Sequence, residues 1–225
     1  SFTETTSRYM SDQYKTVVGI ADSKLEVKKS RFIGLATALQ NQDAIKDFLD
    51  LTRKQYPNAS HYCYAYKIET GSEIREYATD AGEPTHSAGP PMLSAIKAAE
   101  LSNVICVIVR YYGGINLGVG GLIRAYGSCA RSCLANAKIE TRILYQTLRL
   151  HVFHNQIGPV LNLCRRLRGN VLNVEYDENA IVYLQIRQQE LDSLKANLQR
   201  MAANIGVNSI AKPEMYTGVD SGGEP

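Results

Sequence analysis

Several features that define common protein classes are missing from this sequence. No segment approaches the ~18 consecutive apolar residues of a membrane-spanning helix, and no secretory signal pattern begins the chain. The five cysteines, at positions 63, 106, 129, 133 and 164, include no C-x-x-C pair. We therefore expect buried free thiols rather than disulfides or a zinc site, and a cytoplasmic protein with no membrane partner.

A strong charge of either sign is also missing. The 225 residues hold 25 Lys and Arg against 22 Asp and Glu, and the excess lies before residue 144. This balance permits a nucleic-acid partner without requiring one. Two short basic clusters suit either a solvated face or contacts with phosphate: Lys24, Lys28, Lys29 and Arg31, and Arg165, Arg166 and Arg168.

The first part of the chain predicts an α+β domain, which we place at residues 11–143. We expect a turn at Asp22-Ser23 and a loop over 80–91, which holds three of the seven prolines. Apolar patterns predict strands over 14–21, 25–29, 31–39, 61–68, 73–79 and 104–112, and helices over 41–56, 92–101 and about 122–137.

A second domain is predicted over residues 144–218. Alternating and helical patterns follow one another at 148–152, 157–167, 171–176, 180–186, 191–201 and 207–215. The resulting order, β-α-β-β-α-β, is that of a ferredoxin-like domain. Pro213 interrupts the last strand, which favours an edge position because proline cannot donate a ladder hydrogen bond.

The most unusual segment is 107–126, which predicts a buried strand, a glycine loop and a helix. Arg110 and Arg124 bracket the loop, and both are expected to contact phosphate. Such a junction brings backbone N–H groups close to an anion, although close packing of strand and helix is the alternative explanation. The loop lacks the Lys-Ser/Thr pair of a P-loop and an acidic residue for a dinucleotide ribose. Its candidate residues are Tyr111, Tyr112, Gly113, Gly114, Gly118, Gly120 and Gly121.

The proline-containing loop collects polar side chains that suit either chemistry or turn formation. In an enzyme, Glu83 or His86 would act as a base and Thr85 or Ser87 as a nucleophile. Asp80 and the hydroxyl residues are also typical of turns, where they bond to their own backbone. We include Asp80 and Glu83 among the candidate ligand-binding residues.

The strand that begins at His61 has two different faces. Tyr62, Tyr64 and Tyr66 share one face, while His61 and Cys63 share the other. The tyrosines suit either the stacking of RNA bases or burial beneath a helix or the second domain. His61 is a candidate binding residue or a hydrogen-bonded core histidine, and no partner has metal-ligand spacing, so we expect no metal.

Four segments together match one family signature. They are Ser30-Arg31-Phe32-Ile33, His61-x-Cys63-x-Ala65-Tyr66, Asp80-x-Gly82-Glu83-Pro84 and, most specifically, the run from Val109 to Tyr126. On these residues the chain resembles the IMPACT/YigZ family over about residues 14–143. The second domain resembles that of the bacterial YigZ branch. One departure is that Ala81 and Thr85-His86-Ser87 replace the glycine and the Ser/Thr-Gly-Thr of many relatives.

The resemblance implies a fold and a functional class. It implies a ribosomal protein S5 domain 2-like domain followed by a ferredoxin-like domain similar to those of translation elongation factor G. Eukaryotic relatives regulate translation initiation by competing for the activator of a stress kinase. We therefore expect a non-enzymatic, translation-associated regulator without a cofactor, which binds RNA, the ribosome or a translation-related protein. The alternatives are a kinase-like or hydrolytic enzyme that uses the glycine loop, and a purely protein-binding adaptor.

Overall fold

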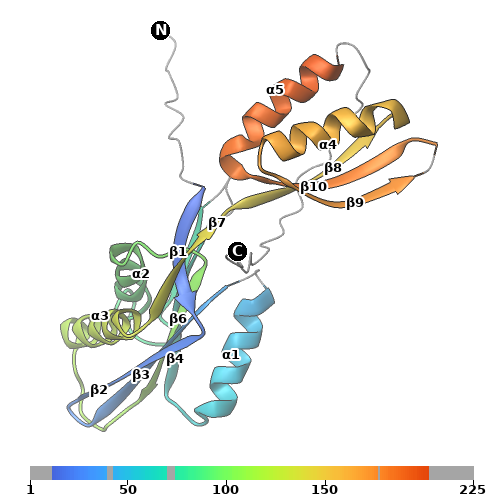
Figure 1. Ribbon diagram of the computed structural model, residues 1–225. Coiled ribbons are helices and arrows are strands. Elements are labelled where there is room, and N and C mark those ends of the chain that lie inside the picture. Colours follow the sequence, from blue (N-terminus) through green and yellow to red (C-terminus); the bar gives the residue numbers. More distant parts are fainter. Residues whose placement is uncertain (1–11, 40–42, 70–73, 177, 203–225) are drawn as a thin grey trace. The chain divides into compact units, whose positions relative to one another are not determined.

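The computed structural model describes residues 12–39, 43–69, 74–176 and 178–202, which form two compact units. One unit is Tyr14–Arg142, and the other contains the described residues before and after it. Both units mix helices and strands (Figure 1). In the part of the chain described, no helix is long and apolar enough to cross a membrane.

The larger unit is built on a five-stranded antiparallel sheet. The strand order is β2 (Ile20–Val27), β3 (Ser30–Ala38), β6 (Val104–Tyr111), β4 (His61–Glu69) and β5 (Ile74–Thr79). The central strand β6 is buried from Val104 to Arg110, as its continuous apolar run predicts. A separate two-stranded sheet pairs β1 (Gln13–Val18) with β7 (Lys138–Ile143).

Helices cover both faces of the five-stranded sheet. α1 (Asp43–Gln55) lies on one face, and α2 (Gly89–Ala98) and α3 (Val119–Ala135) lie on the other (Figure 1). Successive side chains of a strand point to opposite faces. Phe32 and Ile108 therefore join the core under α2 and α3, while Leu35 and Val107 pack against α1.

The second unit is a three-stranded sheet with two helices. The chain runs through β8 (Tyr145–Val152), α4 (Ile157–Arg166), β9 (Asn170–Tyr176), β10 (Ala180–Arg187) and α5 (Leu191–Ala202), with short 3-10 turns η1 (His154–Gln156) and η2 (Gln188–Glu190). The antiparallel order is β8-β10-β9. Leu150 and Leu184 pack against Val160 and Leu194 of the helices. The strand predicted at 207–215 lies outside the described residues.

The structure differs from the predicted elements at three points. Asp22-Ser23 is not a turn but part of β2, and the chain turns at Gly19, whose φ is +69°. α2 begins at Gly89 because prolines occupy its first turn, where a missing N–H costs nothing. β7 was not predicted from the sequence. Its partner is β1, at the other end of the unit, and no local pattern indicates that pairing.

The prediction of free thiols is confirmed. All five cysteines are buried and none forms a disulfide. Cys106, Cys129 and Cys133 belong to the core between the sheet and α3. Burial raises the pKa of the Cys129 thiol to about 11, so this group stays protonated at neutral pH and behaves as a small apolar side chain.

Gly113→Ala should strongly destabilise the protein. A Cβ at this position would overlap backbone atoms of Lys29 and Ser30, which cannot move aside as a flexible side chain does. We expect the free energy of unfolding, measured by urea denaturation, to fall by about 3 kcal/mol.

Gly120→Ala is the matched control in the same segment. Its Cβ would meet only Nη1 of Arg124, at 3.5 Å, and Gly120 lies in the first turn of α3. Because alanine favours helix, stability should stay unchanged or rise by up to about 1 kcal/mol. Equal losses in the two variants would contradict the contact proposed for Gly113.

Candidate functional site

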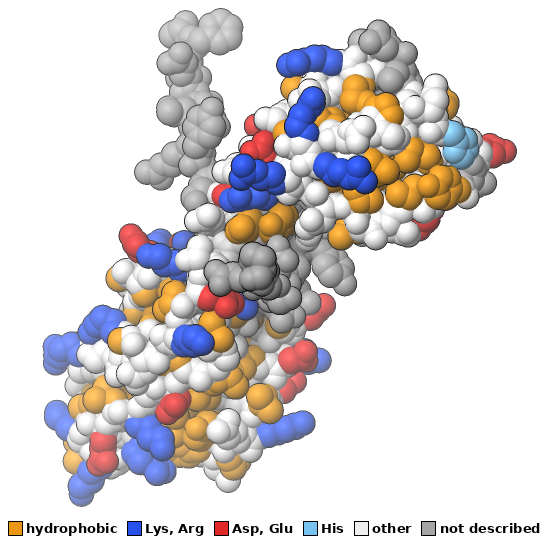
Figure 2. Space-filling view, viewed as in Figure 1, with side chains coloured by type: hydrophobic (Ala, Val, Ile, Leu, Met, Phe, Trp, Pro, Cys, Tyr) orange, Lys and Arg blue, Asp and Glu red, His pale blue; other side chains and the backbone are white. Residues whose placement is uncertain are grey.

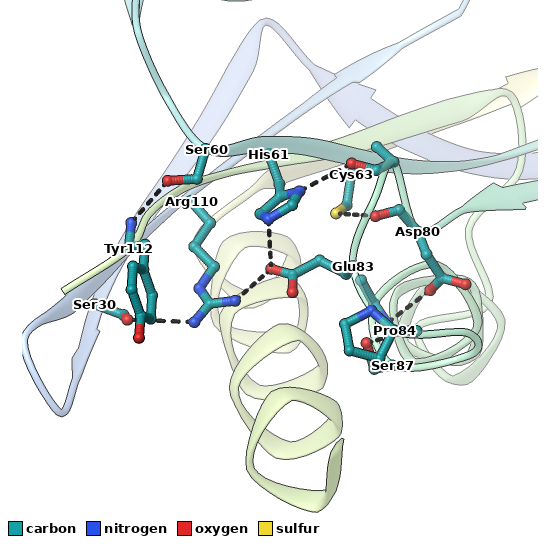
Figure 3. A network of polar contacts seen from close by, with 12 residues as sticks. Ser30, Ser60, His61, Cys63, Asp80, Glu83, Pro84, Ser87, Arg110 and Tyr112 are labelled. Atoms are coloured by element: carbon teal, nitrogen blue, oxygen red, sulfur yellow. Dashed lines mark hydrogen bonds and ion pairs between the residues drawn. The ribbon is translucent and has the colours of Figure 1, made fainter. Parts of the chain in front are cut away.

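A buried ion pair lies between the end of β6 and the loop that precedes α2. Nη1 of Arg110 donates to Oε1 of Glu83 at 2.6 Å, and the two side chains are only 6% and 3% exposed (Figure 3). The short distance and the exclusion of water make this a charge-assisted hydrogen bond. The pair therefore fixes the loop to the sheet.

Glu83 has a second donor, from α3. The hydroxyl of Tyr126 donates to the same Oε1 at 2.7 Å. Burial raises the pKa of Tyr126 above its usual value, so the hydroxyl keeps its proton. Sγ of Cys63 lies 3.4 Å from this hydroxyl and 3.0 Å from the carbonyl oxygen of Asp80. Burial raises the Cys63 pKa to about 12, so this thiol is also neutral.

His61 occupies the more open side of the same network. It is paired with Arg110 across β4 and β6, and its side chain is 25% exposed. Nδ1 lies 3.0 Å from the carbonyl oxygen of Ala81, and because a carbonyl only accepts, Nδ1 carries the hydrogen. Nε2 lies 3.9 Å from Oε1 of Glu83. His61 thus holds the loop at a second point (Figure 3).

Asp80 organises the loop itself. Its carboxylate accepts the N–H groups of His86, Ala88 and Gly89 at 2.8, 2.8 and 2.9 Å, and so caps the start of α2. Burial raises the pKa of Asp80, but the three N–H groups outweigh it and hold the pKa below its usual value. This is the turn-forming role that the sequence offered as one alternative.

Ser30 connects the ion pair to the glycine loop. Its hydroxyl oxygen accepts from Nη2 of Arg110 at 3.4 Å and from the N–H of Gly113 at 3.1 Å. The Tyr112 ring lies 5.5 Å from the guanidinium carbon of Arg110. The proline-containing loop at 80–91 and the glycine loop are therefore connected through Arg110 and Ser30.

The five glycine positions of the loop differ in whether and why a side chain is unfavourable there. Gly113 abuts the backbone at Lys29, whereas Gly114 and Gly118 adopt φ values of +81° and +70°, which disfavour other residues. A Cβ at Gly121 would press on Leu117 at 3.0 Å. Gly120 has neither a positive φ nor a close neighbour other than the end of a flexible arginine.

The first turn of α3 has an unusual charge arrangement. The N-cap residue is Gly118, which has no side chain to cap this end, and no acidic residue lies in the first turn. Arg124 folds back so that its Nη1 lies 3.5 Å from the Cβ position of Gly120. Helix N-termini carry partial positive charge, so a cation there is unfavourable and an anion is favoured.

Comparison with known proteins identifies the family. The Impact N-terminal domain matches residues 28–134, and DUF1949, a domain of unknown function, matches residues 150–204. The chain is 33% identical over 177 residues to an IMPACT family member of Haemophilus influenzae, covering 77% of this chain and 84% of that protein. The chain belongs to the IMPACT family.

Within the IMPACT family it is a bacterial, YigZ-like, two-domain member. YigZ of Escherichia coli is 29% identical over 174 residues, covering 77% of this chain and 85% of that protein. A crystal structure of a hypothetical protein matches with a TM-score of 0.67 and 25% identity, covering 91% of this chain and 100% of that chain. The resemblance seen in the sequence is confirmed.

The IMPACT signature residues His61, Asp80, Glu83 and Arg110 make internal contacts. This differs from the expectation that Arg110 contacts phosphate at the surface, because its guanidinium is buried against Glu83. Within the residues described, no three His, Cys, Asp or Glu side chains are grouped to hold a metal ion. The arrangement is an internal polar network in which both Nη atoms of Arg110 have partners and its buried Nε has none, and the exposed groups lie beyond it in the glycine loop.

The tyrosines of β4 lie on the face of the sheet covered by α1. Tyr64 and Tyr66 pack beside the α1 core, and their ring centroids lie 5.7 and 5.4 Å from that of Tyr77. The hydroxyl of Tyr62 donates to the carbonyl oxygen of Tyr56 at 2.6 Å. This arrangement favours the burial of an aromatic face beneath a helix over an open stacking surface.

Sequence reasoning missed Ser30 and Tyr126 as members of the network. Both lie in the segments that carry the IMPACT signature, so the signal that could have found them was present. Their partners lie 80 and 43 residues away along the chain, and no local pattern indicates such pairings.

Arg110→Met should leave the charge of Glu83 buried and unpaired. We expect the free energy of unfolding to fall by about 3–5 kcal/mol. In the double variant with Glu83→Gln the remaining side chain is neutral and still accepts from Tyr126, so the combined loss should be smaller than the sum of the single losses by about 2 kcal/mol. Strictly additive losses in urea denaturation would show that the pair is not coupled.

Asp80→Asn should weaken the protein by about 1 kcal/mol at neutral pH, because the amide group cannot accept all three N–H bonds. The folded-state pKa of Asp80 is below its usual value, so its contribution is present above about pH 4 and is lost as the pH falls through the folded-state value. The stability difference between the wild type and Asp80→Asn should therefore shrink as the pH falls below about 4. A difference independent of pH would contradict this assignment.

Proposed function

We propose that this chain is a non-enzymatic, translation-associated protein of the IMPACT family that binds RNA, free or within the ribosome. The binding surface is the glycine-loop surface, which we define as residues 112–121 with Lys28, Lys29 and Arg124. The observation that carries the proposal is the position of the Arg124 guanidinium beside Gly120 in the first turn of α3, a helix whose N-cap residue is a glycine. A phosphate bound there would accept from backbone N–H groups and pair with the guanidinium.

The neighbouring residues of the surface supply further contacts for a nucleic acid. The β2–β3 turn carries Lys28 and Lys29, and its backbone packs directly against Gly113. Tyr112 is 48% exposed and offers a ring for a base. Figure 2 shows Lys and Arg spread over the visible faces of both units with Asp and Glu between them, so local geometry rather than a broad basic patch supports the site.

The fold classes implied by the family belong to the same proposal. We assign residues 11–143 to an S5 domain 2-like domain and residues 144–218 to a ferredoxin-like domain. The run β8-α4-β9-β10-α5 and the order β8-β10-β9 support the second assignment. Folds of this kind host many functions, so the site and not the fold carries the functional argument.

A protein partner is the second candidate, because large apolar side chains gather in the same segment. Ile115, Val119 and Ile123 are 42%, 51% and 41% exposed. Exposed apolar side chains around a loop are typical of protein-binding surfaces. Affinity capture of a stoichiometric protein that survives nuclease treatment and is lost in Val119→Ser would select an adaptor instead of an RNA binder.

Arg124→Gln should change stability and binding in opposite directions. Without a bound anion, removal of the cation should raise the free energy of unfolding by about 0.5 kcal/mol. The affinity for a labelled single-stranded RNA, measured by fluorescence anisotropy between about 50 and about 200 mM salt, should fall, and the log–log salt slope should become shallower by about 0.7. The double variant Lys28→Asn, Lys29→Asn should also lower the RNA affinity and make the salt slope shallower. Asparagine tolerates the positive φ of both positions.

Lys46→Gln on α1 is the matched control, because this exposed lysine lies on the helix that covers the opposite face of the sheet. Its affinity and salt slope should equal those of the wild type. RNA affinity that is independent of salt, or equal in all variants, would overturn the proposal. Turnover of Mg-ATP that depends on Arg124 would favour the enzymatic alternative.

A further inference from the structure

A groove lies on the α1 face of the five-stranded sheet, beyond the C-terminal end of the helix. α1 packs over Leu35, Ile105 and Val107, which leaves the start of β3 and the neighbouring β2 uncovered by this helix. The groove has a volume of about 510 Å³ and is lined chiefly by Lys24, Glu26, Arg31, Ile33, Tyr56 and Tyr111. It lies on the opposite face of the sheet from α3, and the RNA-binding proposal does not use it.

One wall of the groove is a stacked pair of planar side chains. Strand pairing places Arg31 opposite Tyr111, and the guanidinium carbon lies 4.8 Å from the ring centroid. The hydroxyl of Tyr111 donates to the carbonyl oxygen of Pro57 at 3.0 Å, which holds the ring in place. Guanidinium and phenol planes are surfaces on which nucleic-acid bases stack. The platform is therefore formed before any ligand binds.

The charged side chains of the groove favour an anion. Lys24 and Arg31 are exposed and face a single carboxylate, Glu26, which strand pairing places opposite Arg31. Among the described residues, none of these three side chains forms an ion pair. The two cations thus remain available to a negatively charged group, and Glu26 remains available to accept from a hydroxyl or amino group.

We propose that this groove is a nucleotide-binding site, in which the base stacks against the Arg31–Tyr111 pair and the phosphate is bound by Lys24. A volume of about 510 Å³ falls within the usual range for small-molecule sites. A sugar phosphate alone has no aromatic base to stack on the platform, and a nucleoside has no anionic group for the lysine. The nucleotide has two sources, a free nucleotide or an unpaired residue of an RNA strand. The proposal does not depend on RNA binding by the glycine-loop surface.

Calorimetric titration of the full chain measures separately how much the base and the phosphate of the ligand contribute to affinity. The probes are AMP, adenosine and ribose 5-phosphate, with GMP, CMP and UMP to compare bases. AMP should bind, while adenosine and ribose 5-phosphate should each bind at least about tenfold more weakly, because each lacks one contact. Adenosine that binds as tightly as AMP, or no binding of any of the four nucleotides together with no effect of groove variants on RNA, would overturn the proposal.

Two groove variants and one control locate the site. Arg31→Lys keeps the charge but loses the planar group, so AMP affinity should fall about tenfold. Lys24→Gln should weaken AMP and ribose 5-phosphate while leaving adenosine unchanged. Lys46→Gln, outside the groove, should leave all three affinities unchanged. AMP affinity that is equal in Arg31→Lys, Lys24→Gln and the wild type would place the nucleotide elsewhere and overturn the assignment.

Comparison of single-stranded and duplex RNA of the same length identifies the source. If Arg31→Lys weakens the single strand and leaves the duplex unchanged, the groove receives an unpaired residue of RNA. If the same variant weakens AMP and leaves both RNAs unchanged, the groove receives a free nucleotide. The double variant Lys28→Asn, Lys29→Asn distinguishes a failure of the RNA-binding proposal from a failure of the nucleotide-groove proposal. RNA binding that this variant leaves unchanged counts against the glycine-loop surface, while AMP binding tests the groove independently.

Discussion

The ion pair between Arg110 and Glu83 is the constraint on which the rest of the larger unit depends. It joins the end of the central strand to the loop before α2, and Tyr126 brings α3 to the same carboxylate. Ser30 extends the connection to the glycine loop through the N–H of Gly113. Loss of either partner would leave a buried charge unpaired, so the segments that meet at this pair must assemble together. The signature residues of the family therefore hold the loops and α3 to one end of the sheet.

The internal use of Arg110 determines which residues the two proposed sites use. Its guanidinium is unavailable to ligands, so both proposed sites use residues that flank it. The Arg124 guanidinium lies beside the first turn of α3 on one face of the sheet, and the Arg31–Tyr111 pair lies on the other. A cation at the positive end of a helix is a local disadvantage for folding, which is typical of sites shaped by binding rather than by stability. The rigid network below supplies a fixed base for the exposed loop.

Local patterns were sufficient for most elements but not for the contacts that define the site. Apolar patterns predicted strands at β3, β4 and β6, the alternation in β4 predicted its two different faces, and the glycine run predicted a loop followed by a helix. β7 was missed because its partner, β1, lies at the other end of the unit. The need for glycine at 113 depends on the backbone at Lys29, and the burial of Arg110 depends on Glu83, 27 residues away. Contacts between residues so far apart in the chain produce no pattern that a single sequence reveals.

The last residues of β6 give each successive side chain a different environment. Arg110 points into the core beside Phe32, Tyr111 turns to the opposite face of the sheet, and Tyr112 is exposed before Gly113 meets the β2–β3 turn. A slip of one position in the pairing of β6 would exchange every one of these environments, placing a tyrosine against Glu83 and a guanidinium in the groove. Insertions or deletions of a single residue here should therefore be far less tolerated than substitutions. The spacing of this segment, as much as its composition, is what the fold must preserve.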